Sequence, residues 1–413
     1  MRIGNIKYFN LYLLILFSFI VRIAAVYHYG DAEIEHEWKE LLINLYNNGV
    51  LSLHQFDGKI IPSVFMPPLY VYFLYTLKLF TPENFDLIKI ILFTQVILST
   101  ISIFIFYKLS NLLFSKNWSI LNAFLLSIFP FKIYTVTQIS SITLQFFLLI
   151  LYLYLFLLFN KSGKFIWYKI IFFSIVSGLL MLTRGEFYII FFISLIYLFF
   201  LKKVNLKKSA VILLISLLVI SPYLTRNYLV FNKIIMTNSL GFNLWKGNNP
   251  FSTVEGSLSL EAHKHDKIYE KIDKLPKNNL FELYHDDLFL KEGLVHIKNE
   301  PVIFIKRFIK RSLSFFYFNT NSDYPNYYHP LFIIPICLLS IFSSFGILIS
   351  LKKLNFETGY LLLYLFLTIG IFSLFFILPR YKMIILPIQL IFMNYFFIEY
   401  SKKMNFFKKL FLR

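Results

Sequence analysis

Long runs of hydrophobic residues alternate along the chain with short polar clusters. Such runs are typical of transmembrane helices, because a helix of a soluble domain is apolar on one stripe only. The pattern predicts an all-α polytopic membrane protein with eleven hydrophobic segments. They lie at residues 8–27, 66–80, 90–107, 118–137, 139–159, 170–183, 187–201, 210–224, 330–351, 359–378 and 383–398.

The basic residues between these segments predict how the chain is threaded through the membrane. Lys and Arg are concentrated at both termini and in alternate loops, and they favour the cytoplasmic side. Both termini are therefore predicted to be cytoplasmic, which requires an even number of crossings. Segment 66–80 is short and opens with Pro67 and Pro68, so we predict that it enters the membrane without crossing it. The prediction is a bundle of about ten to eleven transmembrane helices, of which ten cross fully.

Two polar regions interrupt the hydrophobic pattern, and this topology places both outside the cytoplasm. They divide the chain into an N-terminal transmembrane catalytic module at 1–224, an extracytoplasmic region at 225–329 and C-terminal transmembrane helices at 330–413. The first module contains the acidic outer loop 29–65.

The extracytoplasmic region 225–329 is predicted to be small and helical. Two helical patterns, at 258–275 and 280–298, follow a turn-rich stretch around Gly247. The stretch 301–318 then repeats Lys and Arg at helical spacing beside Ile and Phe. That pattern suits a helix on an anionic lipid surface, a lid over a headgroup site or a plain solvated helix.

Composition narrows the class of protein. Of 413 residues, 58% are hydrophobic and 15% are charged, which excludes an ordinary soluble domain. The net charge of +19 lies mainly in loops between hydrophobic runs, so it does not indicate nucleic-acid binding. Cys337 is the only cysteine and lies in an apolar run, which excludes an intrachain disulfide. The sequence has neither a glycine-rich phosphate loop nor a G-x-S-x-G motif, so nothing supports ATPase or hydrolase chemistry.

The first candidate for chemistry is the acidic run directly after segment 8–27. Asp31, Glu33, Glu35 and Glu37 alternate there within seven residues. If this piece is helical, Asp31 and Glu35 share one face and Glu33 and Glu37 share another. The run is either a loop that opposes insertion in the wrong orientation or the site of a general base.

Charged residues also recur at the predicted outer ends of the hydrophobic segments. They are Arg22, Arg184, Arg226 and Arg380, with Lys382 close by. Each side chain could simply snorkel to the interface. Together with the acidic run they could instead line an outward cavity for a phosphate-bearing lipid, because Arg binds phosphate through two hydrogen bonds. His263 and His265 form an isolated His-x-His without an evident partner cluster, so no metal site is predicted.

Several short pieces occur in an order that is found in one family of membrane enzymes. They are the acidic loop with Asn44, Leu45 and Gly49, then Phe65-Met66-Pro67-Pro68-Leu69-Tyr70, residues 178–184, Ser221-Pro222-Tyr223-Leu224-Thr225-Arg226-Asn227-Tyr228, Asn243-Leu244-Trp245-Lys246-Gly247-Asn248-Asn249-Pro250, and Pro379-Arg380-Tyr381. With these pieces the chain resembles the C-type (GT-C) membrane glycosyltransferases, in particular protein O-mannosyltransferases and lipid A aminoarabinose transferases.

The resemblance implies an inverting transferase that takes a sugar from a polyprenyl-phosphate donor at the outer membrane face. The acceptor would be a lipid, a glycan or a protein, and no cofactor or metal is carried over. An outer-loop carboxylate would be the base, with Glu35 or Glu37 nearest to the expected position and Asp31 further upstream. The family often has a Glu early in a middle span, where this chain has Gln145.

The resemblance also implies which residues would bind the substrates. The donor phosphate would be bound by Arg184, Arg226, Arg380 and Lys382. Substrate-binding residues would include Pro67, Pro68, Tyr70, Trp245 and Asn248. The alternatives are a flippase or transporter for lipid-linked glycans, which needs no base, and an O-antigen-type ligase, which uses the same chemistry at the outer face.

Overall fold

The computed structural model describes residues 2–161, 166–256, 262–317 and 329–411. Each of the eleven predicted hydrophobic segments is helical. The helices are α1 (Arg2–Tyr29), α3 (Pro68–Phe80), α4 (Leu87–Leu113), α5 (Lys116–Ile128) with α6 (Pro130–Thr137), α7 (Ile142–Leu157), α8 (Ile166–Thr183), α9 (Phe187–Phe200), α10 (Leu206–Phe231), α15 (Pro330–Leu351), α16 (Phe356–Ser373) and α17 (Leu386–Phe411). Two 3₁₀ turns, η1 (Leu158–Asn160) and η3 (Pro379–Ile384), follow α7 and precede α17.

The multi-span membrane architecture is confirmed. In the described residues, six helices are long and apolar enough to cross a bilayer, and a seventh is counted if α5 and α6 form one span. Helices α8 and α9 are apolar but shorter. Helix α3 has 13 residues, about 20 Å at 1.5 Å per residue, against a hydrocarbon core of about 30 Å. This length agrees with partial entry into the membrane, while the count of ten crossings stays a prediction.

The segment predicted as one helix at 118–137 is broken. Helices α5 and α6 meet at an angle of 50°. Pro130 has no N–H to continue the ladder and disfavours the helical conformation at Phe129, whose φ and ψ are −64° and 114°. The predicted segment 118–137 is therefore helical but bent, and it forms either one broken span or a re-entrant loop.

The polar regions have their own small elements. The first outer loop contains α2 (His36–Asn48) and the hairpin β1 (His54–Phe56) with β2 (Lys59–Ile61). The second region contains α11 (Leu240–Asn248), α12 (Ala262–Asp273), α13 (Phe281–Asn299) and α14 (Pro301–Ser314). The predicted helices at 258–275, 280–298 and 301–318 are confirmed within their described parts. The hairpin was not predicted, although the Asp57-Gly58 turn, with φ of 48° and 77°, is its usual signal.

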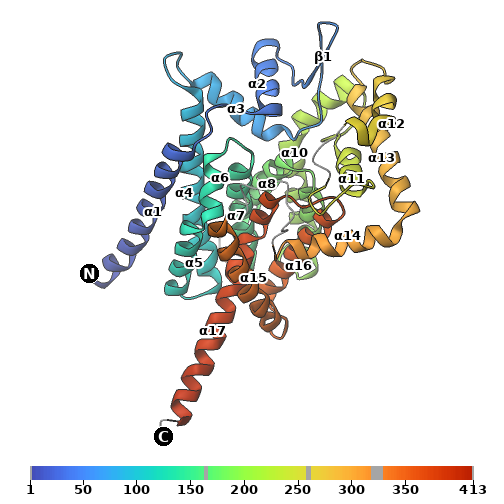
Figure 1. Cartoon of the computed structure of the whole chain (residues 1–413). Helices are drawn as coiled ribbons and strands as arrows, with labels where there is room; N and C mark the ends of the chain where they lie inside the picture. The colour runs from blue at the N-terminus through green and yellow to red at the C-terminus, as the bar shows by residue number, and fades with distance from the viewer. Residues whose placement is uncertain (1, 162–165, 257–261, 318–328, 412–413) are drawn as a thin grey trace.

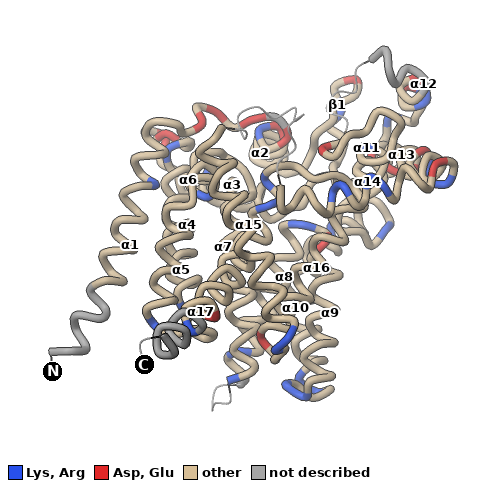
Figure 2. Tube along the Cα trace, turned by 60° about the horizontal axis from the view of Figure 1, so that its bottom comes forward, with Lys and Arg blue, Asp and Glu red and all other residues tan. Residues whose placement is uncertain are grey.

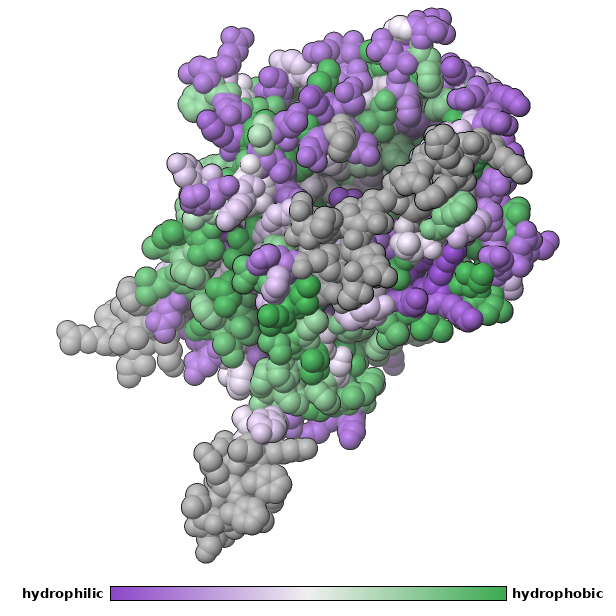
Figure 3. Space-filling model, viewed as in Figure 1, coloured by the Kyte–Doolittle hydropathy of each residue, from purple (hydrophilic) through white to green (hydrophobic). Residues whose placement is uncertain are grey.

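The long helices run side by side, and the small elements gather at one end of the bundle (Figure 1). Helix α4 packs between α5 and α7, α8 packs on α10, and α15 packs on α17. Both chain termini lie at the end away from α2 and β1 (Figure 1). Acidic residues gather near α2, α12 and α13, whereas Lys and Arg occur both around α11 to α14 and in loops at the opposite end (Figure 2). Hydrophobic residues cover the lower part of the surface in Figure 3, where soluble proteins would carry charge.

Candidate functional site

A small pocket with a largely apolar lining and a few polar groups lies where η3 meets α7 and the turn between α8 and α9. Arg184, Arg380, Gln145 and Tyr381 line it together with aliphatic side chains of α7 and η3. Gln145 is buried, and its Nε2 donates to no described residue. The pocket therefore presents two guanidinium groups and an unused amide donor, a set that suits an anionic ligand.

Arg184 is held in place by a carboxylate and two aromatic rings. Its Nε forms an ion pair with Glu186. Its guanidinium lies 5.0 Å from the centre of the Phe372 ring and 4.5 Å from that of Tyr381. The turn between α8 and α9 places Arg184 beside η3 although the two are about two hundred residues apart in sequence. Stacking on rings fixes the plane of the guanidinium, which is needed for bidentate binding.

Lys246 is a further cation that was not among the predicted site residues, and it lies outside the pocket lining. Burial lowers its pKa, the Arg380 guanidinium lowers it further, and the Glu37 carboxylate raises it. Its Nζ lies 4.9 Å from the centre of the Phe376 ring. Lys246 is thus the electrostatic neighbour of both Arg380 and Glu37, residues from two distant parts of the chain. The next residue, Gly247, has no room for a side chain because the backbone of Phe375 lies against it.

Lys382 is a buried cation close to the pocket. Its Nζ donates a hydrogen bond of 2.5 Å to the Tyr317 carbonyl. Burial lowers its pKa to about 7, against a smaller raising effect from Glu255. Its side chain is 7% exposed, so its charge is weakly screened by water.

The acidic run is not helical before His36, so the condition for pairing Asp31 with Glu35 and Glu33 with Glu37 on helix faces is not met. Helix α2 begins at His36, and Glu35 is its extended N-cap residue. Glu35 and Glu37 are exposed to solvent. Glu33 forms a surface ion pair with Lys39, with a distance of 3.4 Å between Oε2 and Nζ.

Asp31 ties the end of α1 to the connection between α6 and α7. Its Oδ2 accepts a hydrogen bond of 2.6 Å from the Ile139 N–H, and its own N–H donates to the Thr137 carbonyl at 2.9 Å. Burial raises the pKa of Asp31, the Ile139 hydrogen bond lowers it and Glu35 raises it. One of its carboxylate oxygens therefore has a structural task, and its electrostatic link to Glu35 places the two acids close together.

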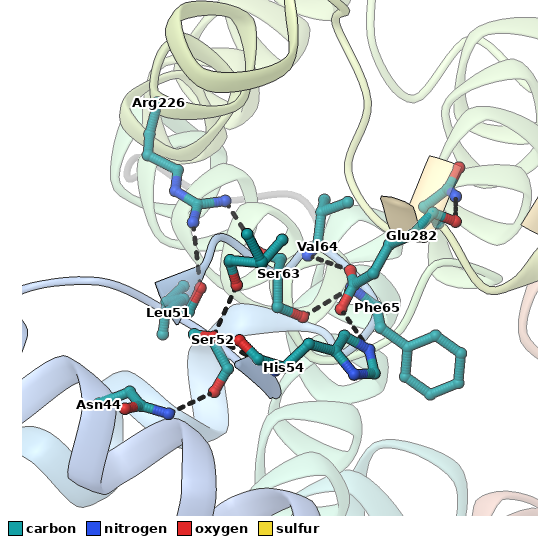
Figure 4. Close-up of polar contacts among 11 residues, drawn as sticks. Asn44, Leu51, Ser52, His54, Ser63, Val64, Phe65, Arg226 and Glu282 are labelled. Carbon is teal, nitrogen blue, oxygen red and sulfur yellow. Dashed lines mark hydrogen bonds and ion pairs between the residues drawn. The ribbon is translucent and has the colours of Figure 1, made fainter. Parts of the chain in front are cut away.

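Arg226 lies outside the pocket lining and anchors the first outer loop instead (Figure 4). Its guanidinium donates to the carbonyls of Ser63 at 2.9 Å and Leu51 at 3.4 Å, and to Asn227 Oδ1 at 2.8 Å. The structure thus separates Arg226 from Arg184 and Arg380, with which the sequence grouped it.

Glu282 of α13 anchors the same loop from the other side (Figure 4). It accepts a hydrogen bond of 2.7 Å from the Val64 N–H and lies 3.4 Å from His54 Nε2. The loop that carries the candidate bases is therefore fixed between α10 and α13.

Arg22 also lies away from the pocket. It is fully buried in the bundle, where it donates to Ser99 Oγ at 2.8 Å, Ser18 Oγ at 2.7 Å and the Ser127 carbonyl at 3.2 Å. These bonds join α1 to α4 and α5. Its task is the packing of helices, which the sequence did not reveal.

The predicted substrate-binding residues lie at the start of α3 and in α11. Pro67 and Pro68 begin α3, and Tyr70 is buried, with its hydroxyl donating to Gln95 Oε1 at 3.1 Å. Trp245 is buried against Phe289, with 4.7 Å between the ring centres. Asn248 is buried and donates to the carbonyls of Leu244 and Leu374. Tyr70, Trp245 and Asn248 thus line no open surface in this structure.

No group of three or more His, Cys, Asp or Glu side chains that could hold a metal ion occurs in the described residues. The side chains of His263 and His265 lie outside them.

Known proteins with a similar sequence or fold indicate the class of protein to which this chain is similar. Residues 66–225 match the family described as dolichyl-phosphate-mannose-protein mannosyltransferase. No curated protein sequence matches the chain. Among solved structures, the chain is similar to the archaeal oligosaccharyltransferase AglB from Archaeoglobus fulgidus in complex with an inhibitory peptide and a dolichol-phosphate. The TM-score is 0.59 at 16% identity, covering 98% of this chain and 52% of that chain.

Two further structures are similar. The Archaeoglobus fulgidus oligosaccharyltransferase in complex with Zn and sulfate has a TM-score of 0.54 at 17% identity, over 95% of this chain and 50% of that one. ArnT from Cupriavidus metallidurans bound to undecaprenyl phosphate has a TM-score of 0.45 at 8% identity, over 94% of this chain and 77% of that one.

The resemblance to C-type membrane glycosyltransferases that was predicted from the sequence is confirmed by the family match and by the fold. The chain spans about half the length of the solved oligosaccharyltransferase. The fold is thus similar to that of a solved oligosaccharyltransferase, and residues 66–225 match a family of mannosyltransferases.

Proposed function

We propose that this protein transfers a sugar, with inversion, from a polyprenyl-phosphate donor to a lipid, glycan or protein acceptor. The observation that carries the proposal is the pocket that Arg184 and Arg380 line together with Gln145, because it presents two guanidinium groups to an anionic ligand. The charges of Glu37 and Arg380 both act on the pKa of Lys246, which supports a position of the acidic loop near the pocket. A carboxylate beside a cluster of cations is what this reaction needs, because it must accept a proton near a departing phosphate. The dolichol-phosphate in the similar oligosaccharyltransferase supports a donor of this type.

In the proposed reaction, Glu35 or Glu37 takes the proton of an acceptor hydroxyl while that oxygen attacks the anomeric carbon. The bond from the anomeric carbon to the phosphate oxygen breaks, and the lipid phosphate leaves with the electron pair. Arg184, Arg380 and Lys246 stabilise its charge, and Lys382 adds to the local positive potential. The energy of the reaction comes from the sugar phosphate bond, so no nucleotide is required.

The three predicted parts of the chain divide the work in this proposal. Region 1–224 carries the base and one side of the pocket, 225–329 supplies Lys246 and holds the loop, and 330–413 supplies Arg380 and Lys382. Arg226 is assigned to holding the loop rather than to the phosphate.

We also propose that the site faces the outer side of the plasma (inner) membrane and that both termini are cytoplasmic. The common end of the two termini (Figure 1) and the acidic run directly after α1 at the opposite end support this orientation. Single cysteines beside Glu37 and beside Lys352, in a Cys337→Ser background, should be labelled by membrane-impermeant reagents from the outside and the inside respectively. The reverse pattern contradicts the orientation.

Carboxamide substitutions test the reaction. Glu35→Gln and Glu37→Gln are assayed for release of labelled mannose from dolichyl-phosphate mannose by protein in nanodiscs, and Glu33→Gln is the matched control. General-base catalysis is worth about 10²- to 10⁴-fold, so the base variant should lose activity by that factor while Glu33→Gln keeps it. Near-normal turnover of both Glu35→Gln and Glu37→Gln would disprove the base, and lipid translocation without transfer would favour a flippase.

A further inference from the structure

Helix α14 carries an unpartnered apolar stripe on its outer face. Val302, Ile305, Ile309 and Leu313 are 52–61% exposed, and their spacing places them on one side of the helix. Lys306 and Lys310 lie directly beside this stripe and are also exposed. Neither lysine forms an ion pair with any described residue. An apolar stripe with a row of lysines along its edge is typical of a helix in a bilayer interface.

The opposite face of α14 is fixed to the protein. Arg307 donates to the carbonyls of Asn249 at 3.0 Å and Pro250 at 3.2 Å. Arg311 is fully buried and donates to Asn248 Oδ1 at 3.1 Å and to the Gly247 carbonyl. The four basic residues of the helix therefore divide into two that hold the chain and two that point outward.

The position of α14 matches the edge of a membrane. Ser312 Oγ donates to Ser373 Oγ at 2.9 Å, and Ser373 is the last residue of the candidate span α16. The helix crosses the direction of the long helices (Figure 1), near the border between the hydrophobic and the hydrophilic surface (Figure 3). A stripe at this level meets the junction of acyl chains and headgroups when the spans are in a bilayer.

We infer that α14 docks on the membrane surface, with Val302, Ile305, Ile309 and Leu313 among the upper acyl chains and Lys306 and Lys310 on anionic headgroups. The lysines select negatively charged lipid because their charges have no partner within the described protein. Through Arg307 and Arg311, the docked helix also sets the position of residues 247–250, which follow Lys246. This last consequence rests on the proposed function, whereas the docking itself does not.

Spin labels test the docking without any substrate. In a Cys337→Ser background, single cysteines at Ile305 and Ile309 are labelled in nanodiscs of phosphatidylcholine with one quarter phosphatidylglycerol. Labels at Val295 of α13, which is 50% exposed, give the matched control. Collision rates with oxygen and with a water-soluble nickel chelate report the depth of each label. We expect the α14 labels to favour oxygen, at a depth of about 5–10 Å, and the α13 label to favour nickel.

Two results would overturn the inference. Nickel collisions at Ile305 and Ile309 as frequent as at Val295 would place α14 in water. Protection of these labels from both reagents would mean that protein, such as a second copy of the chain, covers the stripe.

The lipid charge is tested separately. Nanodiscs of pure phosphatidylcholine, or the change of Lys306 and Lys310 to Gln, should raise nickel access at Ile309 severalfold. Equal access in neutral and anionic discs would overturn the headgroup assignment. Because none of these measurements involves sugar transfer, their failure is distinct from failure of the proposed function.

Discussion

Arg380 and Arg226 come from two regions of the molecule that look alike in the sequence, and their surroundings differ. Arg380 lines the pocket and makes no hydrogen bond with a described side chain or backbone group. Arg226 already donates to Ser63, Leu51 and Asn227. An arginine whose donors are occupied by carbonyls holds the chain, whereas one that faces a pocket with unused donors can bind an anion. The pattern of charges in a sequence does not separate these two tasks.

The largest expected effect tests the pocket side of this comparison. Arg380→Gln removes a positive charge that would stabilise the leaving phosphate, so kcat/KM for a dolichyl-phosphate sugar should fall about 10²- to 10³-fold. Thermal stability should stay unchanged because Arg380 holds no described part of the chain. Lys352→Gln, which removes an exposed charge at the other end of the bundle, is the control. Equal activity of the two variants would contradict the role of the pocket.

The next effect tests the loop side. Arg226→Gln removes hydrogen bonds from a charged donor to two backbone carbonyls, which we expect to lower local stability by about 2–3 kcal/mol. Hydrogen exchange of amides in residues 51–65 should quicken while the bundle stays protected. Arg226→Lys keeps the charge but loses the planar fork, so it should exchange at an intermediate rate. Lost donor binding with normal exchange would instead place Arg226 among the phosphate ligands.

A smaller effect concerns pH. The pKa of Lys382 is lowered to about 7 by burial, so its ammonium is charged below pH 7 and neutral above it. The positive potential on the donor phosphate therefore falls as pH rises, and KM for the donor should increase up to about tenfold between pH 6 and 8, or ~1.4 kcal/mol. Lys382→Met should show the high KM at both pH values. An unchanged slope in this variant would exclude Lys382 as the origin.

The smallest effect concerns metal. The described acids of the first outer loop are paired or point to solvent. We therefore expect that EDTA changes the rate of sugar transfer by less than about twofold, as for an enzyme that binds its substrate without a metal ion. The rate of transfer is measured again after Mg²⁺, Mn²⁺ or Zn²⁺ is added back to the chelated protein. Loss of activity with EDTA and recovery with one ion would show that the loop rearranges around a metal.

Several single residues of the candidate site were named from the sequence, but the sequence did not show which of them lie together. Arg184 and Arg380, which the sequence analysis grouped as phosphate-binding candidates, line one pocket with Gln145. Their role in binding the donor stays a prediction. Lys246 was missed, although it lies inside the recognised motif at 243–250, because its role depends on the approach of Glu37 and Arg380. Arg22 and Arg226 were grouped with the other arginines because each lies near the end of a hydrophobic run. In the structure, however, Arg22 donates to Ser99 and Arg226 donates to the Ser63 carbonyl, and neither residue lines the pocket.

The amino-acid sequence by itself determined the membrane class, the helical nature of all eleven hydrophobic segments and the acidic character of the first outer loop. These properties follow from hydrophobicity, local helix geometry and the distribution of charge, which act over short stretches of chain. Only the tertiary structure decided which cations face the pocket, because that depends on contacts between residues more than two hundred positions apart. The division of α14 into two holding arginines and two outward lysines was decided in the same way, since a helical repeat shows its faces without showing what each face meets.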